Sequence, residues 1–256
     1  QKIFIKNKYN KNLSVIIETN DNQKGLVFVM HGLGGFKEQP HMETFAKVFK
    51  DNEYTVVRFD TSNTIGESEG NYEDATISNY HSDLEDVISW AKKQKWYQEP
   101  FILVGHSLGG ICTTLYAENH PDEIKAIAPI STVVSGKLSL ERSNIQEELK
   151  KWEETGWEIK GSELKPGVIR KLKWSYIEDR SKHDLLEKIK ILTMPVLLIV
   201  GENDDDAPLG HHKILFNNLP GKKELHIIKD APHIFKEEKH LREIYNIFDN
   251  WIKSLN

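Results

Sequence analysis

Seven short apolar runs, separated by longer helical patterns, constrain the fold of this chain more than any other feature. Several of these runs are apolar at consecutive positions, which is typical of strands buried on both faces of a parallel sheet. Residues 78–94 and 241–255 instead place apolar side chains at helical spacing along one face. The seven runs are residues 13–19, 25–32, 54–60, 101–107, 124–132, 195–202 and 224–231. This alternation predicts an α/β fold, a mostly parallel central sheet with helices on both faces.

Residues 136–190 interrupt the alternation. The segment has no clear strand pattern, is dense in Lys and Glu, and contains Trp152, Trp157 and Trp174. We interpret it as a mainly helical cap, or lid, inserted over the carboxyl ends of the strands; the alternative is an elaborate surface crossover. The predicted core then consists of residues 1–135 and 191–256.

Net charge and cysteine content indicate which binding partners and which cellular compartment to expect. A formal net charge of −5 gives no electrostatic reason to expect a nucleic-acid partner. The single cysteine, Cys112, cannot form an internal disulfide and favours a reducing, cytoplasmic compartment, although a processed N-terminus stays open. No apolar run approaches the roughly 18 to 20 residues that span a bilayer, so we predict no transmembrane segment. The oligomeric state, monomer or homodimer, is left open.

One motif carries a chemical prediction. In "FILVGHSLGG" (101–110), an apolar run leads into Ser107 between Gly105 and Gly109, and a helical pattern follows at once. A sharp strand-to-helix turn pushes a serine hydroxyl out at its tip, where a base can reach it, and crowds the positions two before and two after. Glycine relieves that crowding. The pattern therefore predicts that Ser107 is a nucleophile.

Four motifs carry a resemblance to a known family. They are "HGLGG" (31–35), "GHSLGG" (105–110), "GENDDDAP" (201–208) and "DAPHIF" (230–235). With them, the chain resembles the α/β-hydrolase superfamily in its serine-esterase branch, near the feruloyl (cinnamoyl) esterases and monoacylglycerol lipases. The resemblance covers essentially the whole length and is weakest across residues 136–190.

The resemblance implies a role for five residues. Ser107 would be the nucleophile, Asp204 the acid and His233 the general base, in the chain order that this superfamily uses. Asp204 would hold the imidazole in the correct tautomer and stabilise the imidazolium. The backbone N–H groups of Leu33 and Leu108 would form the oxyanion hole.

We expect no catalytic or metal-binding role for the other candidate residues. His211 and His212 are adjacent, so on a helix they point in different directions, and no carboxylate or cysteine stands at ligand spacing; we predict no metal site. No phosphate-binding loop or dinucleotide fingerprint is present, so no cofactor is implied. We expect His106 to pack beside the turn and Cys112 to be a small buried side chain.

These features together predict a carboxylic ester hydrolase that acts on a small-molecule ester through an acyl-enzyme. Trp152, Trp157 and Trp174 could wall an apolar pocket for the acyl or aryl group. Many relatives carry D-x-R-G-x-G-x-S where this chain has "DTSNTIGESEG" (60–70), so substrate preference is not carried over from them. The alternatives are a monoacylglycerol lipase, a thioesterase or an aminopeptidase of the same fold, and a non-catalytic ligand-binding module.

Overall fold

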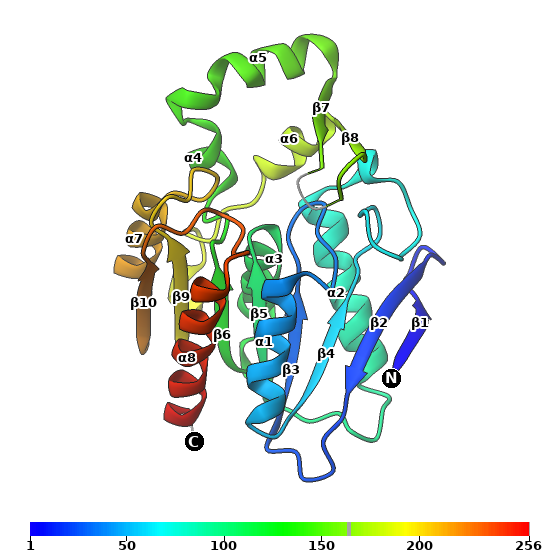
Figure 1. Cartoon of the computed structure of the whole chain (residues 1–256), viewed down its shortest axis with the longest axis vertical. Coiled ribbons are helices and arrows are strands. Elements are labelled where there is room, and N and C mark those ends of the chain that lie inside the picture. Colours follow the sequence, from blue (N-terminus) through cyan, green and yellow to red (C-terminus); the bar gives the residue numbers. More distant parts are fainter. Residues whose placement is uncertain (163–164, 256) are drawn as a thin grey trace.

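An eight-stranded sheet forms the centre of the protein in a computed structural model that describes residues 1–162 and 165–255 (Figure 1). Its strand order is β1-β2-β4-β3-β5-β6-β9-β10. The strands are β1 (Lys2–Lys6), β2 (Asn12–Glu18), β3 (Gly25–Met30), β4 (Tyr54–Phe59), β5 (Phe101–His106), β6 (Ile124–Ile130), β9 (Val196–Gly201) and β10 (Lys223–Ile228). From β4 to β10 all neighbouring strands are parallel, whereas β1 and β2 add antiparallel pairs at one edge. All seven predicted strands are confirmed; β1 was not predicted.

Helices cover both faces of this sheet, as predicted. They are α1 (Pro40–Asp51), α2 (Ile77–Ala91), α3 (Leu108–Asn119), α7 (Leu209–Asn218) and α8 (Glu238–Ser254), with short 3₁₀ turns η1 (Tyr72–Asp74), η2 (Pro121–Glu123) and η4 (Ile189–Ile191). Side chains alternate along each strand, so Val27 and Val29 of β3 join the apolar core with α1 and α8. Phe28 and Met30 point the other way and join the core with α2 and α3.

The segment 136–190 lies beyond the carboxyl ends of the strands, at the upper end of Figure 1. It contains α4 (Gly136–Leu140), η3 (Ser143–Ile145), α5 (Gln146–Thr155), β7 (Trp157–Gly161), β8 (Ile169–Lys173) and α6 (Ser175–Arg180). Its two ends meet where the Gly136 N–H donates to the His183 carbonyl at 2.8 Å. The segment is mainly helical, but the expectation that it holds no strand was wrong, because β7 and β8 form an antiparallel hairpin.

Parallel strands bring distant parts of the sequence to one edge of the sheet. The carboxyl ends of β5, β9 and β10 meet there, and the loops that follow carry Ser107, Asp204 and His233. Open α/β sheets bind ligands at this edge.

Candidate active site

Ser107 stands at the strand-to-helix turn between β5 and α3. Its backbone has φ 54° and ψ −115°, a conformation that L-residues rarely adopt and that stores strain. The flanking glycines are required by close approach, since a Cβ on Gly105 would lie 2.2 Å from the Gly109 carbonyl oxygen. A Cβ on Gly109 would lie 2.5 Å from the carbonyl oxygen of Met30 on the adjacent β3. The turn has the geometry that the sequence motif predicted.

Hydrogen bonds connect Ser107 to the other two predicted residues. The Oγ atom of Ser107 lies 2.9 Å from Nε2 of His233. On the other side of the ring, Nδ1 lies 2.9 Å from both carboxylate oxygens of Asp204. In the tautomer that suits this arrangement, Nδ1 donates to Asp204 and Nε2 accepts the serine hydroxyl. The structure therefore brings the three side chains into one chain of hydrogen bonds.

Asp204 differs from its two acidic neighbours. Its carboxylate is fully buried, and Oδ1 also accepts the N–H groups of Asp206 and Ala207 at 3.1 and 2.8 Å. The residues Asp205 and Asp206 are exposed. Only the first of the three adjacent aspartates contacts the imidazole, which is the position that the sequence spacing favoured.

The electrostatics of the pair favour an ionised Asp204. Burial raises the pKa of Asp204, but the hydrogen bond and charge of His233 outweigh burial and lower it below its ordinary value. Burial lowers the pKa of His233, and the hydrogen bond and charge of Asp204 outweigh this and raise it above the ordinary 6.5. A carboxylate in this position stabilises the imidazolium that forms when the ring takes a proton.

His106 supports the loop that carries His233. Its Nε2 lies 2.9 Å from the His233 carbonyl oxygen and donates to it. Burial, followed by the nearby His233 ring, lowers the pKa of His106 to about 3, so this ring is neutral at physiological pH. His106 packs beside the turn, as expected from the sequence.

The two predicted oxyanion donors lie next to Ser107. Leu33 lines the same cavity as Ser107 and His233, and Leu108 is the first residue of α3. Neither backbone N–H donates to a partner among residues 1–162 and 165–255. Leu108 is at the N-terminus of α3, where such N–H groups can bind developing negative charge, and Leu33 is in the loop after β3.

A cavity of about 300 Å³ opens above Ser107 and His233. Its walls include aromatic side chains from the core side, Tyr72, and from the segment 136–190, Trp152 and Tyr176. Four basic and two acidic side chains line it as well: Arg142, Lys160, Arg170, Arg180, Glu158 and Asp206. The wall is therefore rich in charge, which differs from the apolar pocket expected from the tryptophans.

The three tryptophans have different positions. Trp152 lines the cavity, and its indole Nε1 donates to the Leu172 carbonyl at 3.1 Å. Trp174 meets Trp152 edge-on with ring centroids 6.1 Å apart. Trp157 is 37% exposed and lies in a separate depression beside α5 and β7. Of the three, only Trp152 is in the wall of the cavity that holds Ser107.

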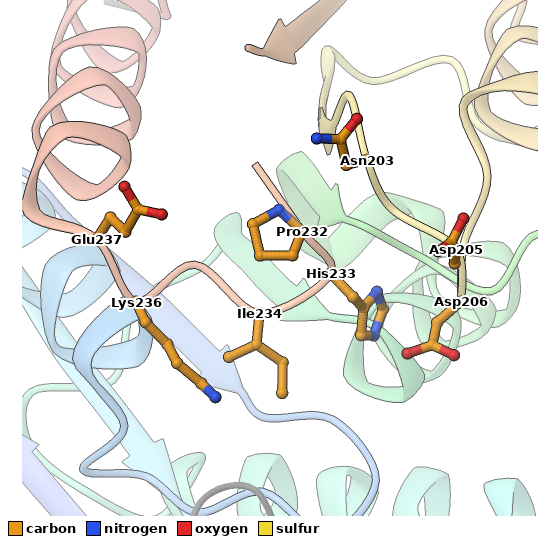
Figure 2. A pocket seen from close by; sticks show the side chains of 8 residues that line it. All are labelled: Asn203, Asp205, Asp206, Pro232, His233, Ile234, Lys236 and Glu237. Carbon is orange, nitrogen blue, oxygen red and sulfur yellow. The ribbon is translucent and has the colours of Figure 1, made fainter. Parts of the chain in front are cut away.

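A second depression, of about 410 Å³, lies beside the loop of His233 (Figure 2). Figure 2 shows His233 and Ile234 on this loop, with Asp206 beside the imidazole and Lys236 and Glu237 further along the chain. His233 and Asp206 line both cavities, so the imidazole stands between them.

The other groups considered from the sequence have structural contacts. His212 is buried, and its Nε2 accepts the Thr132 N–H at 2.9 Å. Burial raises the pKa of the Cys112 thiol well above its ordinary value, which suits an inert core side chain. Within the described residues, one group of three carboxylates, Glu38, Asp60 and Glu67, has ligand-like spacing. The Lys37 ammonium lies between them, at 3.1, 2.8 and 2.7 Å.

Sequence reasoning missed the charged wall of the cavity. Arg142, Arg170 and Arg180 come from three separate places in the segment 136–190: the turn after α4, strand β8 and the end of α6. Tyr72 precedes α2, and the Arg170 guanidinium lies 5.8 Å from its ring centre. The only signal in the sequence was the density of basic residues in this segment, which is equally typical of a solvated surface.

Comparison with known proteins agrees with this fold. The family model for the alpha/beta hydrolase fold matches residues 25–155, more than half of the chain. Bovine palmitoyl-protein thioesterase ABHD10, mitochondrial, is 27% identical over 206 residues, which cover 79% of this chain and 65% of the bovine protein. The thermostable monoacylglycerol lipase of Bacillus sp. (strain H-257) is 25% identical over 218 residues, covering 81% of this chain and 82% of the lipase.

A solved structure is similar over almost the whole length. Est1E from Butyrivibrio proteoclasticus, bound to ferulic acid, superposes with a TM-score of 0.83 at 20% identity, covering 99% of this chain and 98% of Est1E. At this identity the likeness shows the fold alone. The family match shows that the chain belongs to the α/β hydrolase fold family. Across the described residues, no helix combines the length and apolar character needed to cross a bilayer.

Proposed function

We propose that this protein is a serine hydrolase that cleaves carboxylic esters of small molecules through an acyl-enzyme on Ser107. The observation that carries the proposal is the chain of hydrogen bonds from Ser107 through His233 to Asp204, at a strained turn that holds the serine hydroxyl in the cavity. Neither an isolated serine nor an isolated histidine would have this arrangement.

The proposed mechanism follows from the geometry. His233 accepts the Ser107 proton as the hydroxyl oxygen attacks the ester carbonyl carbon, while Asp204 stabilises the resulting imidazolium. The N–H groups of Leu33 and Leu108 bind the oxyanion of the tetrahedral intermediate, each donor contributing on the order of 3 kcal/mol. The imidazolium then protonates the departing alcohol. Water next attacks the acyl-enzyme carbonyl carbon as His233 accepts its proton, and His233 returns that proton to the Ser107 oxygen when the bond between this oxygen and the acyl group breaks.

In this proposal the segment 136–190 acts as a cap that selects substrates. It contributes Trp152 and the basic side chains to the wall of the cavity, whereas Ser107, Asp204 and His233 all come from loops at the edge of the sheet. Such a division leaves the reaction in the core and the choice of ester to the cap.

Thioester hydrolysis is the second candidate, because curated relatives at 25–27% identity are named palmitoyl-protein thioesterases. The mechanism would be the same. The charged cavity wall is unsuited to a long apolar acyl chain, however, because the chain would leave charged groups without water or partners. We therefore favour short acyl groups for either ester type.

A panel of substrates tests the proposal. Wild-type protein should hydrolyse p-nitrophenyl acetate and butyrate faster than the octanoate, and Ser107→Ala should reduce each rate to background. Phenyl butyrate and S-phenyl thiobutyrate separate oxygen esters from thioesters with one acyl group. Loss of activity with a chelator, restored by zinc, would overturn the serine mechanism.

A further inference from the structure

Three arginines converge on the cavity above Ser107. Arg142 lies between α4 and η3, Arg170 is in β8, and Arg180 is the last residue of α6. They are far apart along the chain, and the fold of the segment 136–190 brings all three to the wall that faces Ser107 and His233.

These arginines have no carboxylate partner within ion-pair distance among residues 1–162 and 165–255. The Nε atoms of Arg170 and Arg180 are buried and lack any hydrogen-bond partner in the same part of the chain. Within the described part of the chain, Arg142 donates only to backbone carbonyls, those of Ser139 at 3.1 Å and of Asp205. Guanidinium groups held in a cavity wall without counter-ions carry a desolvation cost that a bound anion would offset.

The acidic side chains of the cavity do not neutralise this charge. Glu158 pairs with Lys160 at 2.8 Å, and the same ammonium also contacts Glu148, so Lys160 and Glu158 satisfy each other. That leaves Asp206 facing three arginines, without an ion pair to any of them among the described residues. Burial, and next the charge of Arg180, lower the pKa of Arg142, and the opposing charges of the nearby aspartates, Asp206 foremost, do not reverse this.

Resting on the proposed function, we propose that the ester cleaved at Ser107 carries an anionic oxyacid group, a carboxylate or a phosphate monoester, bound by Arg142, Arg170 and Arg180. The planar guanidinium donates two parallel hydrogen bonds to either group. The anion would stand in the cavity while the ester carbonyl lies at Ser107 and the N–H groups of Leu33 and Leu108. A neutral ester of the same size would leave these three cations without an anionic partner, with only the Tyr72 and Tyr176 rings beside Arg170 and Arg180 and two backbone carbonyls beside Arg142.

Matched substrates test this proposal. Phenyl butyrate is the neutral reference. In 4-(butanoyloxy)benzoate and 4-(butanoyloxy)phenyl phosphate the anion is on the alcohol side, and in monophenyl glutarate the carboxylate is on the acyl side. The kcat/KM of each ester, measured by chromatography of the released phenol, is divided by that of phenyl butyrate in the same protein. When the ratio in a variant is compared with the ratio in the wild type, the intrinsic reactivity of each leaving group cancels.

The variant Arg142→Gln/Arg170→Gln/Arg180→Gln should lower the ratio for at least one anionic ester by about 10- to 100-fold, as expected for lost charged hydrogen bonds. Each single substitution should lower this ratio by roughly threefold to tenfold. The single variants therefore keep the test available if circular dichroism shows that the triple variant is unfolded. The control is Arg242→Gln, because Arg242 lies on α8 with a side chain that is 73% exposed. It should leave the ratio unchanged. The anionic ester that responds identifies the oxyacid group and its side of the ester bond.

Salt provides a measurement without any substitution. Raising NaCl from about 0.05 M to about 0.5 M should lower kcat/KM for the preferred anionic ester and leave that for phenyl butyrate nearly constant, since salt screens charge. The inference is wrong if folded variants keep every ratio within about twofold and salt has the same effect on all four esters. Hydrolysis that persists in Ser107→Ala would instead overturn the proposed function, so the two failures are distinguishable.

Discussion

The carboxyl edge of the sheet and the segment 136–190 line the same cavity, but they are built differently. Strands β3, β5 and β9 are buried at every one of their positions, and the loops after β5, β9 and β10 are fixed by tight contacts such as that of Gly105 against Gly109. The hairpin β7–β8 is mostly exposed, with only Leu172 buried among its ten residues. A site that needs atoms held within fractions of an ångström suits the first environment.

This difference in packing matches the different functional roles that we propose for the two regions. The edge of the sheet holds every group to which we assign a bond-making or proton-transfer role. The segment 136–190 supplies side chains that could contact only the remote parts of a substrate. Substitutions at the edge should therefore affect every substrate, and substitutions in the segment should affect the choice among substrates.

The largest effect is expected at His233. His233→Ala removes the proposed base and should lower kcat by about 10⁴- to 10⁶-fold for every ester, as in serine proteases that lose a triad residue. Steady-state kinetics with p-nitrophenyl acetate and butyrate measure it. His211→Ala is the matched control, since His211 is only partly buried on α7 and should change kcat by less than about threefold. Equal losses in the two variants would contradict the assignment.

A smaller loss is expected at Asp204. Asp204→Asn keeps the shape of the side chain but disturbs the tautomer of His233, so kcat should fall by about 10²- to 10⁴-fold. Asp205→Asn is the control, because that side chain is exposed, whereas the hydrogen bond to the imidazole comes from Asp204, so the substitution should cost little. If Asp205→Asn were the crippled variant, the acid would be misassigned although the serine mechanism would survive.

The pH dependence of kcat/KM is a second test of the role of Asp204. His233 must be neutral to accept the serine proton, so kcat/KM falls as pH drops through its pKa. Because Asp204 raises that pKa above 6.5, the wild-type decline should be centred above pH 6.5. In Asp204→Asn the hydrogen bond to a carboxylate is lost, and the decline should move to lower pH. A decline that stays in place would show that Asp204 does not act on His233.

Substitutions in the core and in the segment 136–190 should also differ in their effect on the free energy of unfolding. Phe248 of α8 is fully buried, with ring centres 5.3 Å from Phe45 and 5.7 Å from Phe49, so Phe248→Ala should cost about 3–5 kcal/mol of unfolding free energy. Ile159 of β7 is 60% exposed, and Ile159→Thr should change stability by less than about 0.5 kcal/mol. Urea denaturation measures both. A comparable loss for Ile159→Thr would mean that the segment 136–190 is as tightly packed as the core.

The smallest effect is expected for substrate choice at Trp152. Trp152→Ala widens the cavity, so the ratio of octanoate to acetate hydrolysis should rise by roughly threefold to tenfold. Trp157→Ala is the control, because that ring lies outside the cavity that holds Ser107. The comparison fails if both variants keep the wild-type ratio, or if Trp157→Ala alone changes it.

The sheet and its edge could be predicted from the sequence because their signals are local. Consecutive apolar residues indicate strands buried on both faces, and the crowding at Gly105 and Gly109 follows from the turn itself. The positions of the proposed acid and base could be predicted as well, since Asp204 and His233 each follow a recognisable strand and lie within the motifs that carry the family resemblance. The spacing favoured Asp204 among three adjacent aspartates, and the structure was needed to show that this side chain is the one hydrogen-bonded to the ring.

The segment 136–190 was less predictable for the same physical reason. Strand β7 (WEIKG) alternates apolar and polar residues over only four positions, and β8 (IRKLK) does not alternate at all, so the pattern that would mark these strands is weak. Strand β1, with the sequence KIFIK, is a short edge strand whose partner β2 was the stronger signal. The arginines of the cavity are three among 34 basic residues, and only tertiary structure shows which of these face Ser107.

Covalent labelling of Ser107 tests the central claim most directly. A fluorophosphonate reacts with an activated serine but not with an ordinary one, so intact-mass spectrometry of the full-length protein should show one adduct, mapped by peptide sequencing to Ser107. Ser107→Ala should remain folded and unlabelled, and His233→Ala should label far more slowly. Labelling that persists in Ser107→Ala, or that maps to another residue in the wild type, would contradict the account.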